Sequence, residues 1–124
     1  MEKISDTQKK LMQRKFYEIH ELIRNQEWNK LETNNLYCKC SKEDMIEDIL
    51  FELAEYPGTV TYCTFDEFIL GVNIEDDGIL SNDQILACAS VFLDGKMSDL
   101  SIECIFSFDN DIITKTYLTQ VHVF

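Results

Sequence analysis

Cys38 and Cys40, in the segment YCKC, are the residues whose types most directly suggest metal chemistry. Thiolates bind zinc, and the other ligands available are Cys63, Cys88, Cys104, His20 and His122. Structural zinc sites usually contain two cysteine pairs with two to four intervening residues. This pair has one intervening residue, and the chain has no second pair. We therefore expect neither a metal site nor another cofactor.

The two histidines are the next candidates, because imidazole is the commonest acid–base catalyst. The chain has no serine elbow, no Cys-His signature and no glycine-rich phosphate loop, and its four glycines are scattered singly. His20 lies close to the apolar side of a predicted helix, and His122 lies in a predicted strand. We expect structural histidines and a protein that is not an enzyme. The alternative function is small-molecule binding or isomerase-like chemistry in a pocket of a curved sheet, lined by Tyr62, Asp99, Tyr117 and His122.

Carboxylates dominate the segment DMIEDILFELAEY, residues Asp44 to Tyr56. Its acids fall mainly outside the apolar stripe of Met45, Ile46, Ile49, Leu50 and Leu53. Acids four residues apart on a helix repel by a few tenths of a kcal/mol, roughly. One interpretation is a solvated face that aids solubility; the other is a docking face for a basic partner. Together with the segment EDD, the candidate partner-binding residues are Asp44, Glu47, Asp48, Glu52, Glu55, Glu75, Asp76 and Asp77.

The distribution of charge supports the docking interpretation. The net charge is −12. Residues 1–35 contain seven Lys or Arg and six Asp or Glu, whereas residues 36–124 contain four and seventeen. The excess acid therefore follows the first predicted helix. This balance excludes conventional nucleic-acid binding, which needs clustered Lys and Arg to neutralise phosphates.

Length and composition predict one folded domain over residues 1–124, with 45% apolar residues and one proline. The N-terminus has no signal-peptide pattern, and the longest apolar runs are too short to span a membrane. Five cysteines are an odd number, which favours reduced thiols over a disulfide framework. We expect a cytoplasmic protein without a membrane segment.

Two segments have helical periodicity. The capping-box pattern SDTQ begins a helix predicted from Ser5 to Asn25, and Trp28 and Leu31 indicate a short turn or a second helix after it. SKED at 41–44 begins another helix, which Pro57 ends because proline disfavours helical geometry at the residue before it.

From Val60 onward the apolar pattern alternates with a period of two, which predicts strands. VTYCTF and FILGVNI are predicted as short strands. QILACASVFL (84–93), LSIECIFSF (100–108) and the segment beginning IITKTYL form a predicted antiparallel meander, with DGKMSD between the first two. One face of the 100–108 strand should be buried and the other, with Ser101, Glu103 and Ser107, largely wet. The predicted fold class is α+β, with N-terminal helices packed on a curved antiparallel sheet of about four strands.

The order of elements, with DGKMSDLSIECIF at Asp94–Phe106 and YLTQVHVF at Tyr117–Phe124, resembles small bacterial α+β immunity proteins. These belong to contact-dependent growth inhibition and related polymorphic toxin systems and are loosely similar to the nuclear-transport-factor-2-like fold. The resemblance covers mainly residues 84–124. It implies a cytosolic, non-catalytic protein specific for one toxin domain, often a nuclease with a basic surface. The family supplies no site residues to carry over.

The leading functional hypothesis is therefore an immunity protein that neutralises a cognate toxin by covering its active site or substrate groove. A third alternative is an adaptor or structural subunit that dimerises through its sheet.

Overall fold

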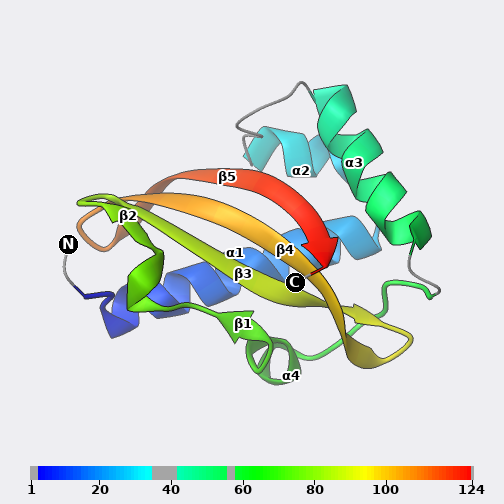
Figure 1. The fold of residues 1–124 in the computed structure, drawn as a ribbon, viewed down its shortest axis with the longest axis horizontal. Helices are drawn as coiled ribbons and strands as arrows, with labels where there is room; N and C mark the ends of the chain where they lie inside the picture. Colours follow the sequence, from blue (N-terminus) through cyan, green and yellow to red (C-terminus); the bar gives the residue numbers. More distant parts are fainter. Residues whose placement is uncertain (1–2, 35–41, 56–57, 124) are drawn as a thin grey trace.

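The computed structural model describes residues 3–34, 42–55 and 58–123. Helices precede an antiparallel sheet, so the predicted α+β class is confirmed (Figure 1). The helices are α1 (Asp6–Arg24), α2 (Trp28–Asn34), α3 (Lys42–Glu55), α4 (Phe65–Ile69) and the 3-10 turn η1 (Asp76–Gly78). The strands are β1 (Val72–Asn73), β2 (Ile79–Ser81), β3 (Gln84–Leu93), β4 (Lys96–Asp109) and β5 (Ile112–Val123).

Helix α1 begins at the capping box predicted from the sequence. The Gln8 backbone N–H donates to Ser5 Oγ at 3.1 Å, and the Ser5 backbone N–H donates to Gln8 Oε1 at 3.0 Å. Phe16 is fully buried, and its ring meets Phe106 edge-on at 5.1 Å between centroids. No helix in the described ranges combines the length and apolar character needed to cross a membrane.

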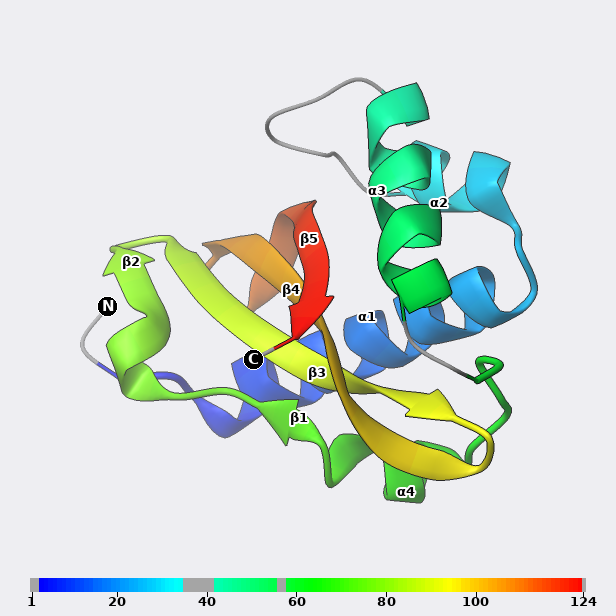
Figure 2. The ribbon, with the colours of Figure 1, turned by 45° about the vertical axis from the view of Figure 1, so that its right-hand side comes forward.

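The sheet has the order β1-β3-β4-β5, and β2 also pairs with β3. Strands β3, β4 and β5 form the predicted meander (Figure 2). The expected six-residue separation between the first two was wrong, because β4 already begins at Lys96. Asp94 and Gly95 both have positive φ, 51° and 80°, as a two-residue hairpin turn requires.

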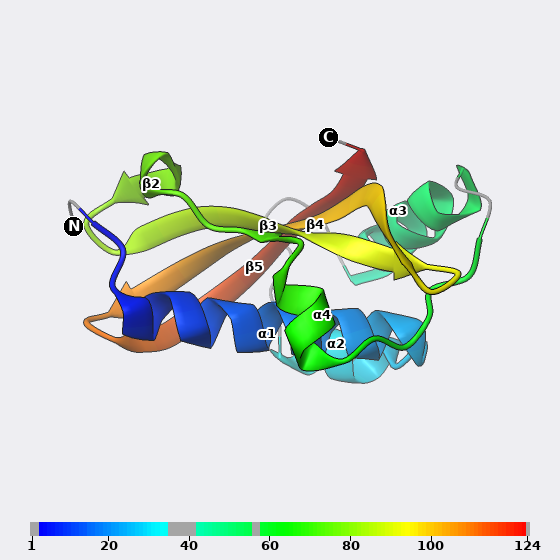
Figure 3. The same ribbon diagram turned by 90° about the horizontal axis from the view of Figure 1, so that it is seen from below.

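Helix α1 covers one face of the curved sheet, with α2 and α4 on the same side (Figure 3). The predicted core residues of β4 are all buried there: Leu100, Ile102, Cys104, Phe106 and Phe108. On the opposite face Glu103 is partly exposed, but Ser101 and Ser107 are 6% and 8% exposed, so the expectation of a largely wet face was wrong for them. Their small side chains lie between β3 and β5, where neighbouring side chains shield them.

The two short strands predicted after Val60 were largely wrong. Val60 makes only an isolated bridge to Leu93, and residues Phe65–Ile69 form helix α4. Thr64 caps this helix by accepting a hydrogen bond from the Glu67 backbone N–H, while Glu67 Oε1 accepts the Thr64 N–H at 2.9 Å. A reciprocal capping box therefore overrides the β-propensity of the aromatic and branched residues here.

Gly78 allows η1 to pack against the open face of the sheet. A Cβ atom at this position would collide with the backbone carbonyl oxygen of Leu86 on β3. We expect Gly78→Ala to lower the free energy of unfolding by about 1–3 kcal/mol, because backbone cannot yield as a side chain can. Urea denaturation measures the change. The control is Gly95→Asn, where a Cβ meets open space and asparagine tolerates the positive φ, so equal losses would contradict the prediction.

Candidate protein-binding surface

Helix α3 attaches to the rest of the molecule by one side. Ile49 is 1% exposed, and Ile46 and Leu53, which are three and four residues away, are partly buried. The helix contacts β5. Leu50, which the sequence placed in the same buried stripe, is 46% exposed, so this assignment was wrong. It lies 100° around the helix from Ile49, beyond the width of the buried side.

The side of α3 turned away from the core carries most of its carboxylates. Asp44, Glu47, Asp48 and Glu55 are exposed, and Glu52 is partly buried nearer the packed side. Among the side chains that the structure describes, no basic group forms an ion pair with Glu47, Glu52 or Glu55. The carboxylates of Glu47, Glu52 and Glu55 therefore have no counter-ion among the described side chains.

Phe51 lies in the middle of this acidic side and is 63% exposed. Glu47 precedes it by four residues and Glu55 follows it by four, so both carboxylates are its neighbours on the helix surface. Exposure of so large an apolar side chain among charges gains nothing for folding. Aromatic anchors surrounded by polar residues are instead common at the centres of protein interfaces.

An apolar groove of about 310 Å³ adjoins the acidic side of α3. Leu50 and Ala54 line it from α3, while Trp28 and Val60 line it from α2 and from the segment after α3. Arg24 also lines the groove, and its guanidinium donates two hydrogen bonds of 3.0 Å to the Glu21 carboxylate. We define the α3 face as Asp44, Glu47, Asp48, Leu50, Phe51, Ala54 and Glu55, together with this groove.

The other predicted partner-binding residues lie elsewhere. Glu75, Asp76 and Asp77 are exposed at and beside η1, next to β2, at the end of the molecule opposite α3 (Figures 1 and 2). Asp76 Oδ1 accepts the Ile4 backbone N–H at 3.0 Å, so this carboxylate holds the N-terminal segment. The eight carboxylates therefore form two separate groups, of which only that on α3 surrounds an exposed aromatic side chain.

His20 has a structural environment. Its ring is fully buried, and Nε2 accepts the Phe92 backbone N–H at 3.1 Å. Because a backbone N–H can only donate, the ring proton must be on Nδ1, which lies 3.3 Å from Glu21 Oε2. Burial lowers the pKa of His20 below its usual 6.5, although the Glu21 carboxylate partly opposes this shift. His20 thus joins α1 to β3 as a neutral side chain.

The three cysteines whose side chains are described lie in the core or in the sheet. Cys63 and Cys104 are buried, Cys88 is partly buried on the open face of the sheet, and all three are free. Burial raises the pKa of the Cys63 thiol to about 11, which leaves it protonated at neutral pH. Cys38 and Cys40 lie outside the described residues, as does the side chain of His122. Among the residues that are described, no three metal-binding side chains cluster.

Of the residues proposed for a pocket in the sheet, the three whose side chains are described, Tyr62, Asp99 and Tyr117, do not line the grooves along α3, β5 or the open face of the sheet. Tyr62 is 60% exposed and lies beneath the guanidinium of Arg24, and Asp99 is exposed on β4. The open face of the sheet has a groove of about 250 Å³, but other residues line it, among them Asn73, Cys88 and Glu103. Glu103 Oε1 already accepts hydrogen bonds from Thr119 and Gln120.

The apolar part of the α3 face was not predicted from the sequence. The available signal was the position of Phe51, because it lies three or four residues from Glu47, Asp48 and Glu55 and so shares their side of the helix. The groove beside it carried no local signal, since its walls come from segments far apart in the chain.

Comparison with known proteins gives no relative: no family model, curated protein or solved structure matches this chain.

Proposed function

We propose that this protein is an immunity-type inhibitor that binds a basic protein toxin domain through the α3 face. The observation that carries the proposal is the exposed Phe51 between Glu47 and Glu55, whose carboxylates have no counter-ion among the described side chains. The exposed ring adds apolar area that a partner can bury, which solubility alone does not require. A partner with an apolar pocket bordered by Lys and Arg would match this surface in shape and charge.

The two components of the face have different roles in binding. Carboxylates at the rim attract a cationic partner and raise the association rate, to about 10⁸–10⁹ M⁻¹s⁻¹ in the strongest cases at low salt. Phe51 and Leu50 contribute affinity after contact, because burial of apolar surface is worth roughly 25 cal/mol per Å². The groove beside Leu50 offers space for an apolar side chain from the partner.

A nuclease domain is the toxin class that fits this chemistry best. Nucleases bind phosphates with clustered Lys and Arg, so their substrate grooves are basic. Carboxylates projecting from a helix can occupy the places that the phosphates would take. The inhibitor then blocks substrate binding and needs no catalytic group of its own.

Co-expression with the toxin domain encoded in the neighbouring reading frame tests this function. The wild-type chain should restore growth. Glu47→Lys combined with Glu55→Lys should reduce affinity for the toxin by about tenfold or more. Cells that express this variant at a low level should therefore lose protection before cells that express the wild type at the same level. The control is Asp77→Lys combined with Asp109→Lys, which changes net charge equally at the opposite end of the molecule.

Circular dichroism must show that both double variants remain folded. Protection lost only in the Asp77/Asp109 variant would move the interface to the η1 group. Full protection by both variants, or a neighbouring gene with no toxin domain, would contradict the proposal.

A further inference from the structure

Strand β5 is a long free edge of the sheet. It pairs with β4 on one side, and no described strand pairs with its other side. Its C-terminal part lies toward α3 in each view of the fold, whereas its N-terminal part lies away from α3 (Figures 1 and 2). The backbone N–H and C=O groups along such an edge are a template for another strand.

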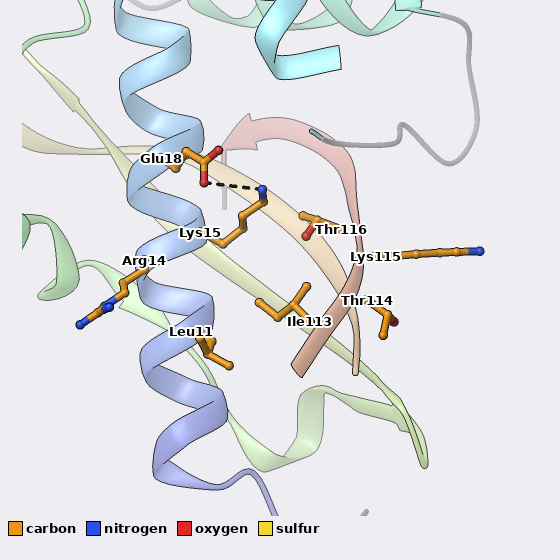
Figure 4. Close-up of a pocket in the computed structure, with 8 residues that line it drawn as sticks. All are labelled: Leu11, Arg14, Lys15, Glu18, Ile113, Thr114, Lys115 and Thr116. Carbon is orange, nitrogen blue, oxygen red and sulfur yellow. Dashed lines mark ion pairs between the residues drawn. The ribbon is translucent and has the colours of Figure 1, made fainter. Parts of the chain in front are cut away.

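A groove of about 320 Å³ follows this N-terminal part of β5, between the strand and α1 (Figure 4). Its walls are Leu11, Arg14, Lys15 and Glu18 of α1 and the consecutive residues 113–116 of β5. Side chains of consecutive strand residues point to opposite faces of a sheet. Four consecutive residues of β5 line this groove, so it contacts both faces of the strand and runs along its edge.

The floor of the groove combines apolar side chains with an unused hydroxyl group. Leu11 and Ile113 are partly buried and supply the apolar part. Thr116 is 5% exposed and is directed toward α1. Its hydroxyl makes no hydrogen bond with any residue in the described ranges. A hydroxyl group can both donate and accept a hydrogen bond, so it is available to a ligand that enters the groove.

The rim of the groove carries more basic than acidic side chains, although the chain as a whole is acidic. Lys15 pairs with Glu18 at 3.6 Å. Arg14 and Lys115 extend away on opposite sides, and neither forms an ion pair with a described residue (Figure 4). Three of the eleven basic residues of a chain with net charge −12 thus border this groove.

We propose that the groove binds an extended acidic segment of a partner protein, which adds to β5 as a further strand. The segment exchanges backbone hydrogen bonds with the free edge. Its alternate side chains are apolar and contact Leu11 and Ile113. The side chains between them are acidic and face Lys115, which shares the open face of the sheet with Ser107, while Arg14 adds positive charge on the α1 side. A second copy of this chain is a poor occupant, because antiparallel pairing of two β5 edges would bring the basic rims together. This site is independent of the α3 face, which has the opposite charge.

A synthetic peptide of about seven residues that alternates Val and Glu is a suitable probe, since strands commonly have this length. Titration monitored by NMR should shift the amide signals of residues 113–116 and show saturation. Arg14→Glu combined with Lys115→Glu should weaken binding by about tenfold or more. Lys30→Glu combined with Lys96→Glu, at two exposed lysines outside the groove, changes net charge equally; it is the matched control and should leave affinity unchanged.

Two modified peptides distinguish strand addition from other modes of binding. The same peptide with Lys in place of Glu should not bind, and N-methylation of alternate peptide nitrogens should abolish binding by removing hydrogen-bond donors. Absence of binding, equal binding of the Lys peptide, or unchanged binding after N-methylation would overturn the proposal. A stable homodimer with protected β5 amides would do so as well.

Discussion

Replacement of Phe51 by alanine is expected to weaken binding of the proposed basic partner by about 30-fold or more, which corresponds to about 2 kcal/mol. The ring is 63% exposed, so its removal takes little from the core. In the complex, however, the same ring would be covered and its apolar area withdrawn from water. Truncation should therefore act mainly on the dissociation rate, whereas loss of Glu47 and Glu55 acts mainly on the association rate.

The matched control for this substitution is Leu70→Ala. Leu70 is 79% exposed on the C-terminal side of α4, outside the α3 face. Surface plasmon resonance with the purified toxin domain separates the two rates, and thermal unfolding checks that each variant is folded. If Phe51→Ala binds as the wild type does, or if Leu70→Ala loses as much affinity, Phe51 is not the anchor of the interface.

Substitution of His20 by alanine is expected to lower the free energy of unfolding by about 2–4 kcal/mol. The change leaves the buried Phe92 N–H without its acceptor and opens a cavity beside Phe68, whose ring centroid lies 5.1 Å from that of His20. His20→Gln should lose less, because an amide oxygen can accept the same hydrogen bond. Urea denaturation of the three proteins at pH 7.5 measures both effects, and equal losses would contradict the role of the Phe92 hydrogen bond.

The same histidine should make stability depend on pH. Its pKa is lowered in the folded protein, so the unfolded chain takes up the proton first as pH falls below about 6.5. Neutral His20 therefore contributes its full stabilisation above about pH 6.5. Below that pH the free energy of unfolding declines by up to about 1.4 kcal/mol per pH unit, until the pKa of His20 in the folded protein is reached. His20→Gln should reduce this decline between pH 7 and 5. An NMR titration in which the His20 ring signal shows a pKa above 6.5 would reverse the predicted sign.

Local sequence patterns determined several elements of this protein. SDTQ begins α1 because its side chains satisfy backbone N–H groups within four residues, and the alternation from Leu100 to Phe108 specifies which face of β4 is buried. These interactions or periodicities are contained within one segment. They allowed the α+β class, α1 and the meander to be predicted, and they identified α3 as acidic.

The tertiary structure decided what those elements expose. Phe51 and Leu50 are residue types that usually lie in a protein core. They are exposed here because α3 packs on the rest of the molecule through its Ile49 side. The separation of the α3 carboxylates from those at η1, and the grooves beside Trp28 and along β5, likewise depend on residues distant in sequence. Composition and periodicity indicate which side chains prefer burial. How much of each side chain is buried depends on the neighbouring helices and strands, whose positions are set only when the chain folds.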